Sequence, residues 1–589
     1  MERSARRAAL GVAGVALVGG FVAGWRLTAN GWGNLYYAGI AVTGAAHPAA
    51  GFFASLEPSS VVSTDKPPLG LWPMMLAVRL LGAHPLAVLL PQLLETVAAV
   101  VVLGATVWWA GRGRAAVVAA LLLAAGPVTF ALARFDDPDT MLLLASVVVA
   151  YAVVRAAADP RKRWLVLLGA ALGAAFLTKW LAGLVVVPAV AWALCGPTAG
   201  RRTRAVLVTA TAAVVSGTWW VGVLAVLGPD RRPYADSSSG SLLHLVLGSN
   251  GVSRLSGDGG GAISGHPGPW RLLLPPFADQ SAWYLPAALV AAALLLLDRA
   301  ARSGAVGGSG PGSPAWRAAV RLFGGWLVVA AVLFSAMGGA MHPYYTSYLA
   351  APAAALLGLA AARVGRGWAS WRPILLVLVA GTTGALALGA TGRSLAGLAG
   401  VAVAAAVLAA VGLAGRTRRG AVVGGVAALV AVLVGPAATD WATLHVVVNG
   451  AAPGAGWSQH GVSSVPPAAL VAFLRAGRGD ATWAAAVPEA TPAAQLQLAS
   501  GLPVLPIGGF TGAAAAPSTA QLARFVEQGR LRYLVLEGRY RTDPAGTPAG
   551  LAGRPVATVV DWARARACPE RVAGVTVLDL GDPGCVARR

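Results

Sequence analysis

The chain has 589 residues, of which 57% are hydrophobic and only 12% are charged, and its mean hydropathy is +0.68. A water-soluble globule has too little interior to hide so many apolar side chains, so the composition excludes a soluble enzyme and predicts a polytopic membrane protein. The formal net charge of +22 does not indicate nucleic-acid binding, because the basic residues stand in separate loops and not in one patch with interleaved aromatic residues.

Apolar runs of membrane-spanning length follow one another up to roughly residue 438, and we expect about 11 to 13 transmembrane helices. The first run, from Ala8 to about Trp25, follows three arginines. It lacks a small-residue cleavage site before Asn30, which favours an uncleaved first helix over a signal peptide.

Basic residues are concentrated in alternate breaks between these runs. Lysine and arginine are retained on the cytoplasmic side of short loops, so these breaks and the N-terminus are predicted to be cytoplasmic. The breaks contain Arg112 and Arg114, Arg155 to Arg163, Arg201 to Arg204, Arg299 to Arg321, Arg363 to Arg372, and Arg416 to Arg419.

The other breaks carry a different chemistry. They hold nearly all the unusual polar residues of the membrane half, including acids, a histidine and paired tyrosines, and they are predicted to face outward. An enzyme that works at the outer leaflet explains this sorting better than a scaffold does. These breaks cover residues 30–39, 63–70, 133–140, 177–180, 228–280 and 338–347.

Five motifs in these outward breaks resemble, in order, those of the family 39 glycosyltransferases. They read Asn-Gly-Trp-x-Asn-x-Tyr-Tyr, Asp-Lys-Pro-Pro-Leu, Arg-Phe-Asp-Asp-Pro-Asp, Phe-Leu-Thr-Lys and His-Pro-Tyr-Tyr. The chain is similar to the bacterial branch that is protein-mannosyltransferase-like and related to the lipid A aminoarabinose transferases. The resemblance implies the multi-spanning C-type glycosyltransferase fold and transfer of a sugar from a polyprenyl phosphate carrier at the outer face.

A leaving polyprenyl phosphate gains negative charge as the glycosidic bond breaks, so a cation is needed beside it. Lys66 is the first candidate, because Pro67 and Pro68 keep its segment out of the following helix and hold it at the interface. The alternative is a snorkelling lysine beside a helix-breaking proline pair. Further candidates for contact with the phosphate are Lys179, His342 and Tyr345.

An acceptor hydroxyl or amine needs a carboxylate base. Relatives often place an Asp-Glu pair in the first outer loop, but here that stretch reads Gly33-Asn34-Leu35-Tyr36-Tyr37. Either Asp65 or the pair Asp136 and Asp137 has taken the role of base, or this branch uses another mechanism. Asp136 and Asp139 are also candidate ligands for a divalent metal ion, the one cofactor that we consider. The competing interpretation is that this acidic stretch caps the helix beginning near Thr140.

The remaining candidates are residues for binding the sugar or the acceptor. Residues 228–280 form a loop too long and too rich in Gly and Ser for a tight connection, which is typical of a binding loop. It lacks a nucleotide-binding turn, which favours a lipid-linked donor. The substrate-binding candidates are Asn34, Tyr37, Arg134, Arg231 and Tyr234.

The hydropathy changes near Asp440, and we divide the chain into a membrane glycosyltransferase domain (1–439) and an extracytoplasmic α/β domain (440–589). "WAAAVP", "LPVLPI" and "LRYLVLEG" predict short buried strands. Cys568 and Cys585 are expected to form a disulfide in this domain, whereas Cys195 lies near a cytoplasmic boundary.

The sequence therefore predicts a multi-pass enzyme of a bacterial cell membrane. It transfers mannose or a pentose from a polyprenyl-phosphate donor to an extracytoplasmic protein, lipid or cell-wall glycan. The alternative of another class is a transporter or flippase of lipid-linked substrates, although no internal repeat supports it. A non-catalytic scaffold would leave the outward motifs unexplained.

Overall fold

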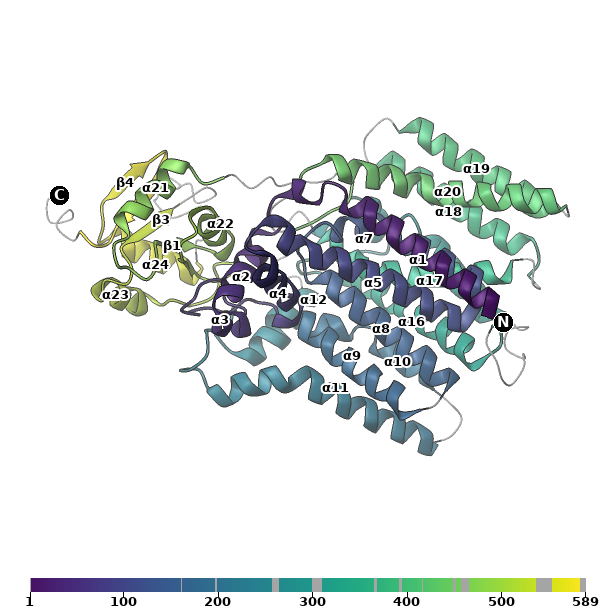
Figure 1. Cartoon of the computed structure of the whole chain (residues 1–589), viewed down its shortest axis with the longest axis horizontal. Helices are drawn as coiled ribbons and strands as arrows, with labels where there is room; N and C mark the ends of the chain where they lie inside the picture. The colour runs from purple at the N-terminus through teal and green to yellow at the C-terminus, as the bar shows by residue number, and fades with distance from the viewer. Residues whose placement is uncertain are drawn as a thin grey trace.

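The computed structural model describes residues 2–582 apart from residues 160, 196–198, 257–263, 299–309, 365–367, 391–394, 416, 449–451, 457–464 and 537–552. Most of these residues form a helical bundle, and a smaller α/β domain follows at one end of it (Figure 1). The N-terminus lies at the far end of the bundle from this domain (Figure 1).

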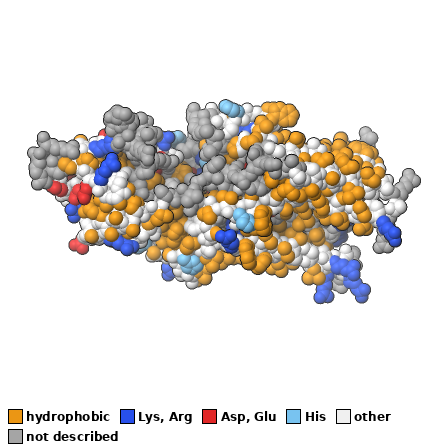
Figure 2. Space-filling view, turned by 90° about the horizontal axis from the view of Figure 1, so that it is seen from above, with side chains coloured by type: hydrophobic (Ala, Val, Ile, Leu, Met, Phe, Trp, Pro, Cys, Tyr) orange, Lys and Arg blue, Asp and Glu red, His pale blue; other side chains and the backbone are white. Residues whose placement is uncertain are grey.

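Ten helices in the described part of the chain are long and apolar enough to cross a membrane. They are α1 (Glu2–Gly24), α5 (Pro85–Gly111), α8 (Asp139–Ala158), α9 (Lys162–Lys179), α11 (Ala199–Leu227), α16 (Pro314–Ala336), α17 (Ser347–Arg363), α18 (Trp371–Ala390), α19 (Ala396–Ala414) and α20 (Arg418–His445). Their outward-facing apolar side chains cover the surface of the bundle (Figure 2). The chain is a multi-pass membrane protein of the expected fold class.

Two further apolar segments form shorter helices inside the bundle, which explains why fewer long helices are found than we expected. These are α6 (Gly113–Ala124) and α14 (Leu285–Leu297). α6 ends just before Gly126 and Pro127, and Pro127 begins the six-residue helix α7 (Pro127–Leu132). Proline is favoured in the first turn of a helix but cannot continue the preceding one, so the apolar segment is split in two.

The core of the bundle consists mainly of alanine, valine and leucine from α5, α6, α8, α16 and α17. Small side chains let these helices approach closely, as expected where lipid supplies no hydrophobic driving force between helices. Gly169 and Gly173 of α9 face the backbone of α11, and a Cβ at Gly169 would lie 2.3 Å from the carbonyl oxygen of Thr209.

The α/β domain has a five-stranded sheet in the order β2-β1-β3-β5-β4. The three predicted strands correspond to β1 (Ala485–Pro488), β2 (Val504–Ile507) and β3 (Tyr533–Leu536), which are parallel. The antiparallel hairpin of β4 (Pro569–Val572) and β5 (Val575–Asp579) was not predicted, because two residues of each short strand are polar. The helices are α21 (Ala468–Gly477), α22 (Ala490–Ser500), α23 (Thr519–Glu527) and α24 (Pro555–Arg564).

Helix α22 packs on α2 (Leu35–Ala46) of the membrane part, so the two parts of the chain share a buried contact. Gln497 donates to Thr43 Oγ1 at 2.9 Å and to the Leu56 carbonyl at 2.7 Å. The indole of Trp483 donates to Glu57 Oε2 at 3.0 Å. The domain is therefore fixed against the loops that carry the first two sequence motifs.

The cysteines agree in part with the prediction. Cys195 is free and exposed, and Cys568 is disulfide-bonded. Cys585, its predicted partner, lies outside the described residues.

Candidate functional site

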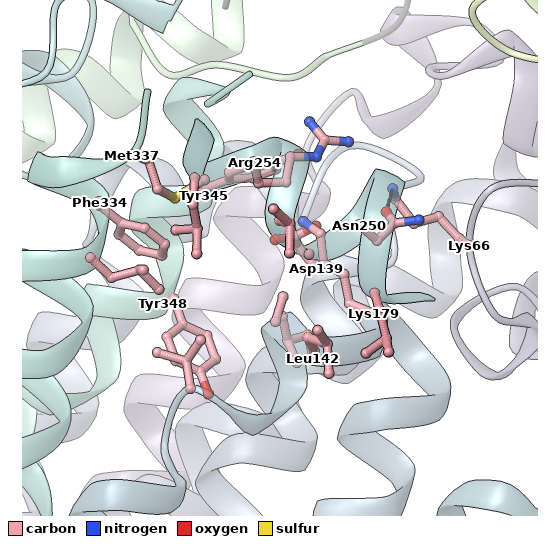
Figure 3. A pocket seen from close by; sticks show the side chains of 18 residues that line it. Lys66, Asp139, Leu142, Lys179, Asn250, Arg254, Phe334, Met337, Tyr345 and Tyr348 are labelled. Atoms are coloured by element: carbon pink, nitrogen blue, oxygen red, sulfur yellow. Dashed lines mark hydrogen bonds and ion pairs between the residues drawn. The ribbon is translucent and has the colours of Figure 1, made fainter. Parts of the chain in front are cut away.

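A cavity of about 410 Å³ opens at the end of the bundle that faces the α/β domain. Apolar side chains from α8, α16 and the loop of residues 228–280 form most of its wall, among them Leu142, Leu247, Leu255 and Phe334. Its polar lining consists of Lys66, Asp139, Lys179, Asn250, Arg254 and Tyr345. Figure 3 shows Lys66 and Lys179 across the cavity from Phe334 and Met337, with Arg254 above them.

Lys66 reaches this cavity from the proline-bounded stretch found in the sequence. Pro67 is extended (φ −71°, ψ 157°), Pro68 begins a single 3-10 turn, and the next helix, α4 (Trp72–Leu81), starts only at Trp72. Lys66 Nζ donates to Asp65 Oδ2 at 2.5 Å and to Asn250 Oδ1 at 3.1 Å. The side chain is 7% exposed, so Lys66 is a bonded, buried cation and not a snorkelling one.

The backbone beneath Lys66 is also held in place. Trp180 Nε1 donates to the Asp65 carbonyl at 2.9 Å, and Asn250 Nδ2 donates to the same oxygen at 3.1 Å. Three segments far apart in the chain therefore position one lysine, as a preorganised binding site requires.

Lys179 supplies the second cation at the last residue of α9. It forms a buried ion pair with Asp139, the first residue of α8. Its Nζ lies 4.0 Å from the ring centroid of Tyr345 and 5.2 Å from that of Tyr344. Two tyrosine rings and one carboxylate thus hold this ammonium group in the cavity wall.

Arg254 is the third cation, and the sequence analysis missed it. It belongs to α12 (Ser253–Ser256), within the long loop we expected to bind substrate. Its guanidinium donates to the Ala340 carbonyl at 3.1 Å, and in the described part of the chain it forms no ion pair with a carboxylate. Arg231, the arginine we selected from that loop, is exposed and does not line the cavity. The sequence contained one feature that could have indicated Arg254: it ends the mainly apolar stretch "HLVLGSNGVSR".

Tyr234 has a structural position outside the cavity. Its backbone pairs with the segment before Asp65: Tyr234 N donates to the Val61 carbonyl at 3.0 Å, and Ser63 N donates to the Tyr234 carbonyl at 3.0 Å. The residue therefore supports the Lys66 loop from behind.

Asp136 and Asp137 lie beside the cavity but do not line it. Asp136 Oδ1 accepts a hydrogen bond from the backbone amide of Asn34 at 2.5 Å. Asp137 Oδ1 accepts from the Asp139 amide at 3.0 Å, at the start of α8. The capping interpretation of this stretch therefore describes Asp137 well. Burial is the main cause that raises the pKa of both carboxyls well above the usual range.

Asn34 and Tyr37 belong to the start of α2, directly under this acidic stretch. Asn34 caps the helix, because its side chain accepts from the amides of Tyr36 (3.1 Å) and Tyr37 (3.4 Å). Gly33 has φ +63°, and a Cβ there would lie 2.1 Å from Asp136 Oδ1. Only glycine therefore permits this approach of the first outer loop to Asp136. Tyr37 is buried, within electrostatic range of Asp65 and Asp137.

Arg134 points away from the cavity. Its guanidinium donates to the Ala23 carbonyl, to Trp25 at 2.7 Å and to Arg26 at 3.3 Å. These carbonyls belong to the C-terminal end of α1 and the turn after it, where helical carbonyls lack partners. In this structure Arg134 caps a helix and does not line the cavity, and its role in substrate binding stays a prediction.

His342 packs against the rings of Tyr344 and Tyr345, with both centroids 5.3 Å away, and the two tyrosine rings also contact each other. Burial, helped by the charges of Arg254, Lys179 and Lys66, lowers its pKa to about 3. The imidazole is therefore neutral near pH 7. Its Nδ1 has no hydrogen-bond partner within the described residues.

The residues that we considered for a metal do not fit one. Asp136 is bonded to the Asn34 amide and Asp139 to Lys179. In the described residues no group of three or more His, Cys, Asp or Glu side chains is arranged to hold a metal ion.

Asp236 is a further buried acid, and the sequence analysis did not select it. Its Oδ2 accepts from the Phe510 amide of the α/β domain at 2.9 Å, and the Phe510 ring stacks on Tyr36 at 5.3 Å. Burial, and then the charge of Asp65, raise the pKa of Asp236 to about 8. This neutral carboxyl joins the domain to the loop of residues 228–280, in which Tyr234 pairs with the segment before Lys66.

We expect Asp236→Asn to stabilise the protein at pH 8 but not at pH 4. Between these values the unfolded chain loses the Asp236 proton while the folded chain retains it, so the free energy of unfolding falls as the pH rises. Asparagine stays neutral and can still accept from the Phe510 amide. At pH 8 the unfolding temperature of the variant should exceed that of the wild type by about 2 °C or more. Asp159→Asn, at a partly exposed carboxylate, is the control, and equal temperatures at pH 8 would contradict the assignment.

The comparisons with known proteins cover both parts of the chain. Residues 65–225 match the family model "Dolichyl-phosphate-mannose-protein mannosyltransferase", and residues 470–563 match "Putative mannosyltransferase YkcB-like, C-terminal". Two similar curated proteins are from Bacillus subtilis. "Putative mannosyltransferase YycA" is 31% identical over a match that covers 36% of this chain and 32% of that protein. "Putative mannosyltransferase YkcB" is 27% identical over a match that covers 37% of this chain and 31% of that protein. The chain therefore spans about one third of the length of these relatives.

Among solved structures, the crystal structure of ArnT from Cupriavidus metallidurans bound to undecaprenyl phosphate matches with a TM-score of 0.53. The match has 16% identity and covers 96% of this chain and 97% of the other. This likeness concerns the fold. Residues 65–225 are thus similar to the dolichyl-phosphate-mannose-protein mannosyltransferase family and residues 470–563 to the YkcB-like C-terminal family, and the chain has the C-type glycosyltransferase fold.

Proposed function

We propose that the protein is a membrane glycosyltransferase that moves a sugar from a polyprenyl-phosphate carrier to an acceptor outside the cytoplasm. The observation that carries this proposal is the cavity in which Lys66, Lys179 and Arg254 share an otherwise apolar wall. A prenyl phosphate has the same two features, an apolar chain and an anionic head. The undecaprenyl phosphate bound to ArnT and the names of the matched families support this substrate class.

The charges of the cavity suit a phosphodiester. Asp65 and Asp139 balance the charges of Lys66 and Lys179. Arg254 then contributes one net positive charge, which matches the single negative charge of the donor phosphodiester. When the bond from the anomeric carbon to the phosphate oxygen breaks, the carrier departs with the electron pair as a monoester and gains negative charge. Cations already in place stabilise that charge without reorganisation.

The acceptor hydroxyl or amine forms the new bond to the anomeric carbon and must lose a proton. We assign Asp65 as the base that accepts this proton. Its side chain is 16% exposed, whereas Asp136 and Asp137 are at most 1% exposed and so less accessible to an acceptor. Burial alone would raise the pKa of Asp65, but the adjacent Lys66 ammonium outweighs it, so the pKa lies below the usual range. The carboxylate is therefore ionised at neutral pH. No step is assigned to a metal ion, because Asp136 and Asp139 already hold other partners.

Mannose is our first choice of sugar, because both family models are named for mannosyltransferases, and a pentose is the second. Protein, lipid and cell-wall glycan are the acceptor classes. The test uses membranes that contain the overproduced protein and polyprenyl phosphate charged with radiolabelled mannose or arabinose. Label should pass to an endogenous acceptor. Label that crosses the bilayer while still attached to its carrier would instead indicate the transporter function.

We further propose that the basic loops are cytoplasmic and that the cavity and the α/β domain face outward. Asp139 and Lys179 of the motif loops lie at one end of α8 and α9, and Arg155 and Lys162 lie at the other end, which supports this orientation. A reporter fused after Arg419 should be cytoplasmic and one fused after Gly450 extracytoplasmic, because α20 (Arg418–His445) lies between these points and basic residues precede it. Alkaline phosphatase and fluorescent-protein fusions measure this, and the same sidedness at both points would contradict the orientation. The division of the chain at residues 439 and 440 stays a prediction, and α20 extends beyond it.

A further inference from the structure

A second cavity of about 410 Å³ lies between α10 (Val187–Leu194), α14 and α16, and nothing in the proposed reaction uses it. Its wall is apolar, from Trp192, Leu295, Leu296, Leu297, Trp316 and Val320. Arg317 and Arg321, one helical turn apart on α16, add two guanidinium groups. Asp298 is the one acid among the described residues of its lining.

This cavity lies at the opposite membrane boundary from the cavity of Lys66. Helix α16 lines both, with Arg317 at one end and Phe334 at the other. Seventeen residues at about 1.5 Å each separate them by about 25 Å. The hydrocarbon core of a bilayer is about 30 Å thick. Arg317 and Arg321 are therefore at the depth of lipid head groups in the other leaflet.

The charge of this cavity is positive. Asp298 is neutralised from behind, because Arg363 Nε lies 2.9 Å from its Oδ2 and Arg372 lies 3.9 Å from its Oδ1. Trp368 Nε1 also donates to Asp298 Oδ2, at 2.7 Å. Arg317 and Arg321 donate only to the carbonyls of Gly312 and Cys195, and neither forms an ion pair within the described residues. Both guanidinium charges are available to an anion.

The mouth of the cavity is suited to a lipid. Leu297 is 67% exposed and Trp192 is 42% exposed, so apolar surface continues from the arginines onto the outer face of the bundle. Tryptophan is common at this depth of a membrane protein. A soluble phosphate would gain nothing from this apolar wall, whereas a phospholipid covers it with its acyl chains.

From this juxtaposition of paired arginines and apolar wall we infer that the cavity binds the head group of an anionic phospholipid. The phosphate contacts Arg317 and Arg321 and the acyl chains lie along Leu297 and Trp192. Basic pockets between transmembrane helices bind anionic lipids in this way. The site is independent of the proposed transferase reaction, and its test needs no activity measurement.

Native mass spectrometry of the whole chain in detergent tests this inference with dioleoyl-phosphatidylglycerol and dioleoyl-phosphatidylcholine. The wild type should prefer phosphatidylglycerol by about tenfold or more, and the double variant Arg317→Gln/Arg321→Gln should lose that preference. Arg161→Gln/Arg163→Gln is the matched control, because both arginines are exposed near the same end of the bundle. The control should bind like the wild type.

Size-exclusion profiles and unfolding temperatures establish that the double variant is folded, and the charge-conserving Arg317→Lys/Arg321→Lys provides a second comparison that should keep most of the preference. Three outcomes would overturn the inference: equal binding of both lipids by the wild type, an unchanged preference in the double glutamine variant, or competition by millimolar glycerol phosphate, which would indicate a site for a free phosphate ester.

Discussion

Lys66→Ala is expected to reduce sugar transfer by about a hundredfold or more, because it removes a positioned cation from the departing phosphate. Lys66→Arg should recover only part of the activity, since a planar guanidinium is a different partner for phosphate from a compact ammonium group. The measurement is transfer of radiolabel from the polyprenyl-phosphate donor at equal amounts of inserted protein.

The structure changes how this experiment must be controlled. Lys66 is buried and bonded to Asp65 and Asn250, so alanine leaves Asp65 without its cation. Lys66→Gln keeps a hydrogen-bond donor for Asp65 while removing the charge, and it should be nearly as inactive as alanine. Lys162→Ala, at an exposed residue at the far end of α9, should be fully active. Normal turnover of both Lys66→Ala and Lys66→Gln would exclude a role for this residue at the phosphate.

Asp65→Asn is expected to cost about a hundredfold or more in turnover if Asp65 takes the proton of the acceptor. Asparagine preserves the shape and removes the base. Asp136→Asn and Asp137→Asn should have smaller effects, because those carboxyls accept backbone hydrogen bonds behind the cavity. Asp159→Asn, at the opposite end of α8, is the control for a remote carboxylate.

The pH dependence gives this prediction a second measurement. Because the pKa of Asp65 is below its usual range, the base stays ionised as the pH falls from 8 to 5, and its protonation should not reduce turnover in that interval. Near-normal activity of Asp65→Asn together with an inactive Asp137→Asn would transfer the role of base to the second loop. Asp65 would then be the ion-pair partner of Lys66 only.

The two cations that were selected from the sequence occupy similar positions in it. Lys66 and Lys179 stand at the ends of apolar segments, and the local pattern together with the family resemblance singled them out. The carboxylates were harder to interpret. "ARFDDPDT" contains three acids in four residues, and only the folded chain distributes them: Asp136 to the Asn34 amide, Asp137 to the start of α8, and Asp139 to Lys179.

The sequence by itself determined the membrane class and the parallel strands of the C-terminal domain, because apolar runs are local properties of the chain. Only the tertiary structure decided that Arg254 and not Arg231 lines the cavity, that Arg134 caps α1, and that Asp236 joins the α/β domain to the loop of residues 228–280. Each of these contacts joins residues distant in the chain. They depend on how helices and long loops pack against one another, which no periodicity in a single segment encodes.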